Sequence, residues 1–209
     1  MILKMRKEKL EELNKLIEKY KIKKVSKERY NPNGFLRVLT AEYTLNNGKT
    51  IQRDRLEKNK LDGNSCTILP ITKDKEVVLV VQPRVFLKSG VGVEIPAGLC
   101  DANEEAETAA KRELLEETGY SSDKFIKLTE YYQDEGCSRA VTTCYLALDC
   151  EKVAEQNLDD DEYISIFKCT FNEMLELQEM GYISGIITII ASEKAQNYFE
   201  KNNIKMIDQ

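Results

Sequence analysis

Hydrophobic residues near the N-terminus recur at intervals of three or four positions between lysines and glutamates. The positions that carry this pattern are Leu10, Leu13, Leu16, Ile17 and Tyr20. This period is typical of an amphipathic α-helix with one apolar face. We therefore expect a helix near the start of the chain that packs against another surface.

After Gly34 the pattern changes to short strand-like segments. Asn46, Asn47 and Gly48 separate segments 42–45 and 50–53. Asn and Gly tolerate the positive φ angles of tight hairpin turns. The sequence therefore predicts a small antiparallel N-terminal sheet, and we divide the chain into an N-terminal element, 1–62, and a larger domain, 63–209.

The larger domain alternates buried strand patterns with helical patterns. Strands are predicted at 65–71, 76–82, 91–95, 125–132, 140–148 and 162–169, and helices at 104–118, 172–180 and 185–201. Gly119 and Gly181 follow two of these helices, as expected for left-handed C-terminal caps. This order predicts an α+β fold with a mixed sheet between helices.

Composition narrows the classes of partner. The chain has 209 residues, 42% hydrophobic and 32% charged, and carries a net charge of -5, which is typical of a soluble globular protein. No long basic run is present to follow a phosphate backbone, so we expect a small-molecule partner and no nucleic acid. No apolar segment approaches bilayer length, and the N-terminus alternates lysine with glutamate, so we expect no membrane association and a cytoplasmic location.

Composition also narrows the chemistry. The chain contains no histidine, which excludes an imidazole base or imidazole metal ligand. Its six cysteines form no C-x-x-C pair, so they are interpreted as reduced, mostly structural residues. Catalysis would therefore depend on carboxylates, lysine, tyrosine, cysteine or a metal ion.

Three acids on the helix predicted at 104–118 stand out. At about 100° per residue, Glu113, Glu116 and Glu117 share a face with alanines at 106, 109 and 110. Carboxylates directed toward the protein body repel one another unless protons or a cation neutralise them. A hard divalent ion with oxygen ligands fits such a cluster, although a solvated acidic helix end remains the structural alternative.

The residues around this cluster resemble the Nudix box, G-x5-E-x7-R-E-U-x-E-E-x-G-U, where U is a bulky apolar residue. The matching positions are Gly98, Glu104, Arg112, Glu113, Leu114, Glu116, Glu117, Gly119 and Tyr120, of which only Tyr120 is a loose match. The resemblance implies a Nudix α/β/α sandwich that hydrolyses nucleoside diphosphates linked to another group, with Mg²⁺ or Mn²⁺.

Flanking segments resemble the ADP-ribose and nucleotide-sugar pyrophosphatase branch of that family. They are the N-terminal hairpin, 82–84, 94–98 and 181–184. In that branch the N-terminal sheet typically helps to build a homodimer, so the resemblance implies a dimer here. The implied reaction cleaves the pyrophosphate bond and releases two monophosphates.

The resemblance also assigns roles by position. Glu113 and Glu117 would be the main metal ligands, with Glu116 a third ligand or sharing a bridging ion, and the Ala97 carbonyl would complete the shell. Arg112 would orient the acids, and Glu104 is interpreted as structural because its charge suits a helix N-terminus.

A base is expected in the acidic run 159–162. Glu162 is favoured and Asp160 is second, with a solvated acidic loop as the alternative. Glu94 is a candidate for the outer metal shell and Arg84 for binding phosphate or ribose, each with an ordinary surface ion pair as the alternative.

The substrate remains open because the chain departs from the branch in one place. ADP-ribose hydrolases commonly carry a Ser-Pro-Gly-like loop after the box, whereas residues 133–139 here contain no proline. UDP-sugars, GDP-mannose and dinucleoside compounds therefore stay open beside ADP-ribose. A Nudix domain that binds a nucleotide sugar without cleaving it is the alternative from another functional class.

Overall fold

The computed structural model describes residues 5–22, 34–58 and 60–206. The N-terminal part contains α1 (Lys7–Tyr20), β1 (Leu36–Thr44) and β2 (Thr50–Lys58). The remaining elements are β3 (Ser65–Thr72), β4 (Glu76–Pro83), β5 (Val91–Glu94), β6 (Ala97–Leu99), α2 (Ala106–Thr118), β7 (Tyr120–Ser121), β8 (Lys124–Tyr132), β9 (Val141–Lys152), β10 (Ser165–Thr170), α3 (Phe171–Glu179) and α4 (Ile186–Lys201). No helix in this described part of the chain has the length and apolar character needed to cross a membrane.

The main sheet has eight strands. Its central order is β10-β4-β3-β9-β7, while β5 pairs with β4, β6 with β3 and β8 with β9. β3 and β9 run parallel, and the other pairs are antiparallel. The predicted mixed sheet is therefore confirmed.

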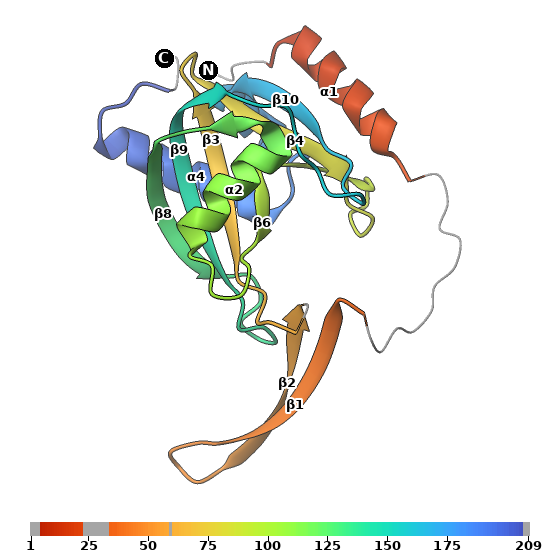
Figure 1. The fold of residues 1–209 in the computed structure, drawn as a ribbon, viewed down its shortest axis with the longest axis vertical. Helices are drawn as coiled ribbons and strands as arrows, with labels where there is room; N and C mark the ends of the chain where they lie inside the picture. The colour runs from red at the N-terminus through yellow and green to blue at the C-terminus, as the bar shows by residue number, and fades with distance from the viewer. Residues whose placement is uncertain (1–4, 23–33, 59, 207–209) are drawn as a thin grey trace.

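Helices cover both faces of this sheet (Figure 1). On one face, Ala109, Ala110 and Leu114 of α2 form an apolar cluster with Cys66 and Ile68 of β3. On the other face, side chains of α1, α3 and α4 form a second cluster with alternate sheet positions. Because β3 lies between two apolar layers, it reads as a continuous buried run instead of an alternating one.

The hairpin of β1 and β2 projects away from the sheet (Figure 1). Its register runs from the Leu36 and Lys58 pair to the Thr44 and Thr50 pair around the predicted turn. β1 is mostly exposed, and the exposed fraction of Val38 is 64%. Leu56 links the hairpin to the rest of the protein by donating its N–H to the Cys137 carbonyl at 2.7 Å.

Three of the predicted boundaries differ from the structure by two residues or more. α2 begins at Ala106 instead of 104, because Glu104 accepts a hydrogen bond from the Asp101 N–H in a preceding turn. β10 begins at Ser165 instead of 162, because Glu162 closes a turn onto the Asp159 carbonyl. β9 continues past 148 to Lys152 through a bulge, which no periodic pattern indicates.

Two short strands escaped prediction altogether. β6 and β7 are only three and two residues long, too short to show a period of two. β6 contains Gly98 and lies beside β3, with Thr67 opposite Ala97 and Cys66 opposite Gly98. The backbone of this strand lies against the carboxylates of Glu113 and Glu117.

Candidate active site

The apolar face of α2 holds the acidic cluster against the sheet. Glu117 is almost fully buried, with 3% of its surface exposed, and the Glu113 side chain is 12% exposed. Lys111, on the opposite face, is exposed. Gly119 ends the helix at a φ of 69° and donates its N–H to the Leu115 carbonyl at 2.7 Å.

Close approach of β6 to α2 requires glycine at position 98. A Cβ atom added to Gly98 would lie 1.9 Å from the Glu113 carboxylate carbon, which no side chain tolerates. The neighbouring Ala97 N–H donates a hydrogen bond to Glu117 Oε2 at 3.1 Å. The structure thus brings together three of the predicted metal ligands, namely Ala97, Glu113 and Glu117.

Arg112 links the remaining acids. Its Nη1 lies 2.7 Å from Glu113 Oε1 and 3.0 Å from Glu116 Oε2. Its Nε and Nη2 hold both oxygens of Glu104 at 3.2 and 3.0 Å, and Nη2 also donates to the Leu99 carbonyl. The hydrogen bonds from Arg112 lower the pKa of Glu104 below its usual value. One guanidinium therefore orients three carboxylates and anchors them to β6.

The protein compensates the negative charges of Glu113 and Glu117 poorly. Burial, with a smaller effect of the charges of Glu113 and Glu162, raises the pKa of Glu117 to about 8 against the opposing hydrogen bond from Ala97. Burial also raises the pKa of Glu113, although Arg112 opposes this effect. A divalent cation would relieve both costs, so these oxygen donors fit a hard ion.

The carboxylates of Glu113, Glu116 and Glu117 do not point toward one common position, as the ligands of a metal ion would. Among the described residues, no three acidic or sulfur-bearing side chains form a group ready to hold a metal ion. The reason is visible in the contacts, since Glu113 and Glu116 face Arg112 while Glu117 faces the Ala97 N–H. Arg112 binds one oxygen of Glu113 and one oxygen of Glu116, and the other oxygen of each carboxylate has no hydrogen bond to Arg112.

Of the two predicted bases, Glu162 is the one whose charge reaches this cluster. Glu162 is half-buried, and its charge raises the pKa of both Glu113 and Glu117. Its Oε2 accepts a hydrogen bond from the Asp159 N–H at 3.1 Å, which holds the side chain in the turn. Asp160 is exposed in the same turn.

Arg84 and Glu94 form a two-pronged ion pair. Arg84 Nε and Nη2 each lie 2.8 Å from one oxygen of the buried Glu94 carboxylate. A Cβ atom added to Gly92 would lie 1.9 Å from Glu94 Oε1, so glycine leaves room for the pair. The Arg84 charge also lowers the pKa of Glu117. Arg84 and Glu94 thus lie near the cluster and are paired with each other.

A cavity of about 330 Å³ opens beside the cluster. Its walls include Arg84, the backbone of β6 and residues that the sequence did not single out, namely Lys58, Ser65, Thr67, Gln133 and Ile187. Gln133 belongs to the loop after β8 that the sequence marked as divergent. No motif in the sequence marks the other four residues as part of a cavity, because strand pairing and helix packing bring them together from distant parts of the chain.

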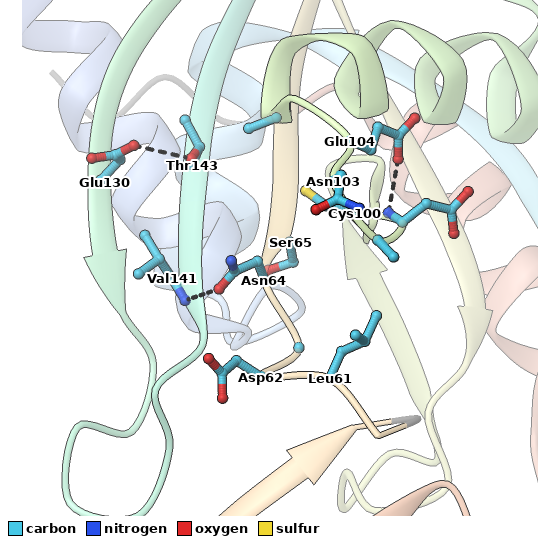
Figure 2. Close-up of a pocket in the computed structure, with 14 residues that line it drawn as sticks. Leu61, Asp62, Asn64, Ser65, Cys100, Asn103, Glu104, Glu130, Val141 and Thr143 are labelled. Carbon is cyan, nitrogen blue, oxygen red and sulfur yellow. Dashed lines mark hydrogen bonds between the residues drawn. The ribbon is translucent and has the colours of Figure 1, made fainter.

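A second cavity, of about 600 Å³, lies on the α2 side of the sheet end. Figure 2 shows Glu130 and Thr143 on one of its sides and Cys100 and Glu104 on the other. It meets the acidic cluster only at Glu104, which Arg112 already neutralises. The smaller cavity, lined by Ala97 and Gly98, is therefore the better candidate for substrate.

Comparisons with known proteins agree with this geometry. The model of the Nudix domain matches residues 63–186. An ADP-ribose pyrophosphatase of Bacillus subtilis (strain 168) is 30% identical over 83% of this chain and 92% of its own length. A GDP-mannose pyrophosphatase of Salmonella arizonae is 32% identical over 74% of this chain and 84% of its own length.

A solved structure supports the fold. The crystal structure of an ADP compounds hydrolase superposes with a TM-score of 0.70 over 86% of this chain and 92% of that one, at 18% identity. Since the domain match covers more than half of the chain and includes α2, β6 and the acidic cluster, this protein belongs to the Nudix family.

Proposed function

We propose that this protein hydrolyses the pyrophosphate bond of nucleoside diphosphate sugars, with ADP-ribose-like substrates favoured, and releases two monophosphates. The observation that carries the proposal is the pair of buried, poorly compensated carboxylates, Glu113 and Glu117, held against the β6 backbone beside an open cavity. Pyrophosphatases acting on ADP-ribose and on GDP-mannose are among its relatives.

Nudix hydrolases generally use divalent metal ions, and we propose Mg²⁺ or Mn²⁺ here. Glu113, Glu117 and the Ala97 carbonyl would hold the ion, with Glu116 as a further ligand. A bound ion of this kind offsets phosphate charge and lowers the pKa of water.

The side chains then divide the remaining work. Arg112 orients the carboxylates of Glu113 and Glu116 through its Nη1. Glu162 takes the proton of the attacking water on its carboxylate, and Asp160 is the second candidate for this role. Arg84 lies on the cavity wall, where its positive charge favours a phosphate group, and Glu94 holds its guanidinium in place.

The substrate within this class is the least constrained part of the proposal. The loop at 133–139 lacks the proline expected for ADP-ribose hydrolases, and a relative at 32% identity is a GDP-mannose pyrophosphatase. GDP-mannose is therefore a second candidate, with UDP-sugars and dinucleotides behind it. A domain that only binds nucleotide sugars is disfavoured because Glu113, Glu116 and Glu117 are all present.

We also propose a cytoplasmic homodimer built through the N-terminal element, 1–62. The exposed apolar side chains of this element support the proposal, since 55% of Phe35, 53% of Leu36 and 64% of Val38 is accessible in one chain. The domain at 63–209 would carry the catalytic residues. Sedimentation of the full chain and of the Val38→Asp variant tests this, with a shift toward monomer expected for the variant.

A substrate panel tests the activity directly. Purified protein is incubated with ADP-ribose, GDP-mannose and a UDP-sugar, with Mg²⁺, with Mn²⁺ and with a chelator. Metal-dependent release of a nucleoside monophosphate and a sugar phosphate supports the proposal. Saturable binding without any product would favour the binding-domain alternative, and neither binding nor product would contradict both.

A further inference from the structure

Gln156 makes a contact that the roles above do not use. Its side-chain Nε2 lies 2.6 Å from the Glu117 carbonyl and 3.5 Å from the Ile164 carbonyl. Both acceptors are backbone oxygens, so only the amide nitrogen can serve them, and its two hydrogens suffice for both. One side chain thus joins the last turn of α2 to the segment that enters β10.

The joined segments are those that carry the acidic residues of the site. Glu117 is the most buried carboxylate of the cluster, and Ile164 follows Glu162 by two residues. Gln156 follows β9 and contacts the end of α2 through its side chain; the chain then forms the turn closed by Asp159 and Glu162 and returns to the same amide at Ile164. The acidic turn is therefore held at both ends by one side chain.

Other bonds hold each of these ends separately. The Asn157 N–H donates to the Glu116 carbonyl at 2.9 Å, and Lys152 Nζ donates to the Thr118 carbonyl at 3.0 Å. These bonds satisfy carbonyls at the end of α2, as helix termini require. At the second end, Ser165 pairs with Val81 of β4, and its Oγ lies 2.8 Å from the Tyr20 hydroxyl. Among the described side chains, only Gln156 is hydrogen-bonded to both α2 and the residue that precedes β10.

We infer that Gln156 is a positioning residue, which sets the place of Glu162 relative to Glu117 by bridging the Glu117 and Ile164 carbonyls. This inference rests on the proposed hydrolytic function and on Glu162 as its base. A displacement of about 1 Å in a catalytic group can cost up to about 100-fold in rate, so a partial loss of this bridge is expected to be measurable.

The test compares Gln156→Met with Lys152→Met. Methionine keeps the approximate length of glutamine without its donors, and Lys152→Met removes a donor to the same helix end without affecting Ile164. For Gln156→Met we expect kcat to fall about 10-fold while KM for ADP-ribose, or for the best substrate of the panel, stays within about twofold. For Lys152→Met we expect kcat within about twofold of the wild type.

A double-mutant cycle separates positioning from general weakening of the fold. In a Glu162→Gln background, Gln156→Met should lower kcat by less than about twofold, because the group that it positions is already lost. A further 10-fold loss in that background would overturn the inference. An equal fall in kcat for Lys152→Met, or no fall for Gln156→Met, would overturn it as well.

A second readout does not depend on turnover. Amide hydrogen exchange in residues 158–163 should be faster in Gln156→Met than in Lys152→Met, and equal exchange rates would contradict the bridge. If the wild type cleaves no substrate of the panel, the proposed function fails while the exchange result still decides the bridge. If the wild type is active and Gln156→Met matches it, the inference alone fails.

Discussion

Glu117 and Glu173 are both nearly buried glutamates on helices, yet their pKa values shift in opposite directions. Burial raises the pKa of Glu117 to about 8. Burial also acts on Glu173, but hydrogen bonds from Arg6 and from the Thr170 N–H outweigh it and lower its pKa to about 2. The difference lies in the partners that the chain supplies to each carboxylate.

Glu173 has every partner that a carboxylate needs. Arg6 Nε and Nη2 bind its two oxygens at 2.7 and 2.9 Å, and the Thr170 N–H donates at 2.9 Å as part of a capping box at α3. Glu117 receives one backbone N–H and lies near two further acids. The comparison separates an acid whose charge the fold neutralises from one whose charge the proposed cation would neutralise.

The largest expected effect on activity comes from substitution of Glu117. Glu117→Gln should lower kcat by about 10²- to 10³-fold, because it removes a proposed metal ligand at the centre of the cluster. The fold should persist, since a neutral amide costs less to bury than a carboxylate. Steady-state kinetics and circular dichroism measure both effects, and an unfolded variant would show that Glu117 is structural.

The next effect concerns the proposed base. Glu162→Gln should lower kcat by about 10- to 100-fold, because proton transfer to a positioned side chain contributes on this order or more. The ion concentration that gives half-maximal activity should change little. Asp160→Asn is the matched control, as it removes an exposed acid from the same turn. Activity lost in the control and kept in Glu162→Gln would transfer the role to Asp160.

Substitution of Glu173 should lower the stability of the protein and leave its catalytic rate unchanged. Glu173→Gln should lower the free energy of unfolding at pH 7 by about 2 kcal/mol, because the pKa depression reports favourable interactions of the ionised form. Urea unfolding measures the loss. The kcat of the folded variant should match that of the wild type, and a variant with unchanged stability would contradict the role assigned to the Arg6 and Glu173 pair.

The last comparison is a difference in pH dependence without metal. Glu173 has a depressed folded pKa, so its contribution is complete above its usual pKa of about 4.5 and is lost only as pH falls toward 2. Glu117 has a raised folded pKa, so its cost grows as pH rises from about 4.5 through 8. Between pH 5 and 9, the stability of Glu117→Gln relative to wild type should therefore rise, while that of Glu173→Gln should stay constant. Urea unfolding in chelator checks this, and parallel curves would contradict it.

Local periodicity was enough to predict the main elements and the acidic face of α2. Ala109, Ala110 and Leu114 bury one stripe of the helix, so the direction of Glu113 and Glu117 follows from their spacing. The resemblance to the Nudix box supplied the metal chemistry, which spacing alone left open. The family is confirmed by the domain match, while the individual residue roles remain predictions.

Contacts between distant segments could not be predicted in the same way. Arg6 and Glu173 are 167 positions apart, and no periodic pattern connects them. Gln156 looked like an ordinary loop residue, because its acceptors are backbone carbonyls that only the folded chain brings together. The Arg84 and Glu94 pair was divided between two separate roles in the sequence, whereas the sheet places the two side chains in contact.

The most direct test of the account is thermal unfolding at pH 8 with and without Mg²⁺ or Mn²⁺, for the wild type and for Glu117→Gln. An ion that relieves the buried carboxylates binds the folded state preferentially, so it should raise the Tm of the wild type by several degrees at saturation. Glu117→Gln should begin at an equal or higher Tm in chelator and gain much less from the ion. An equal rise in Tm for both proteins, or no rise for the wild type, would contradict the claim that a divalent cation binds at these acids.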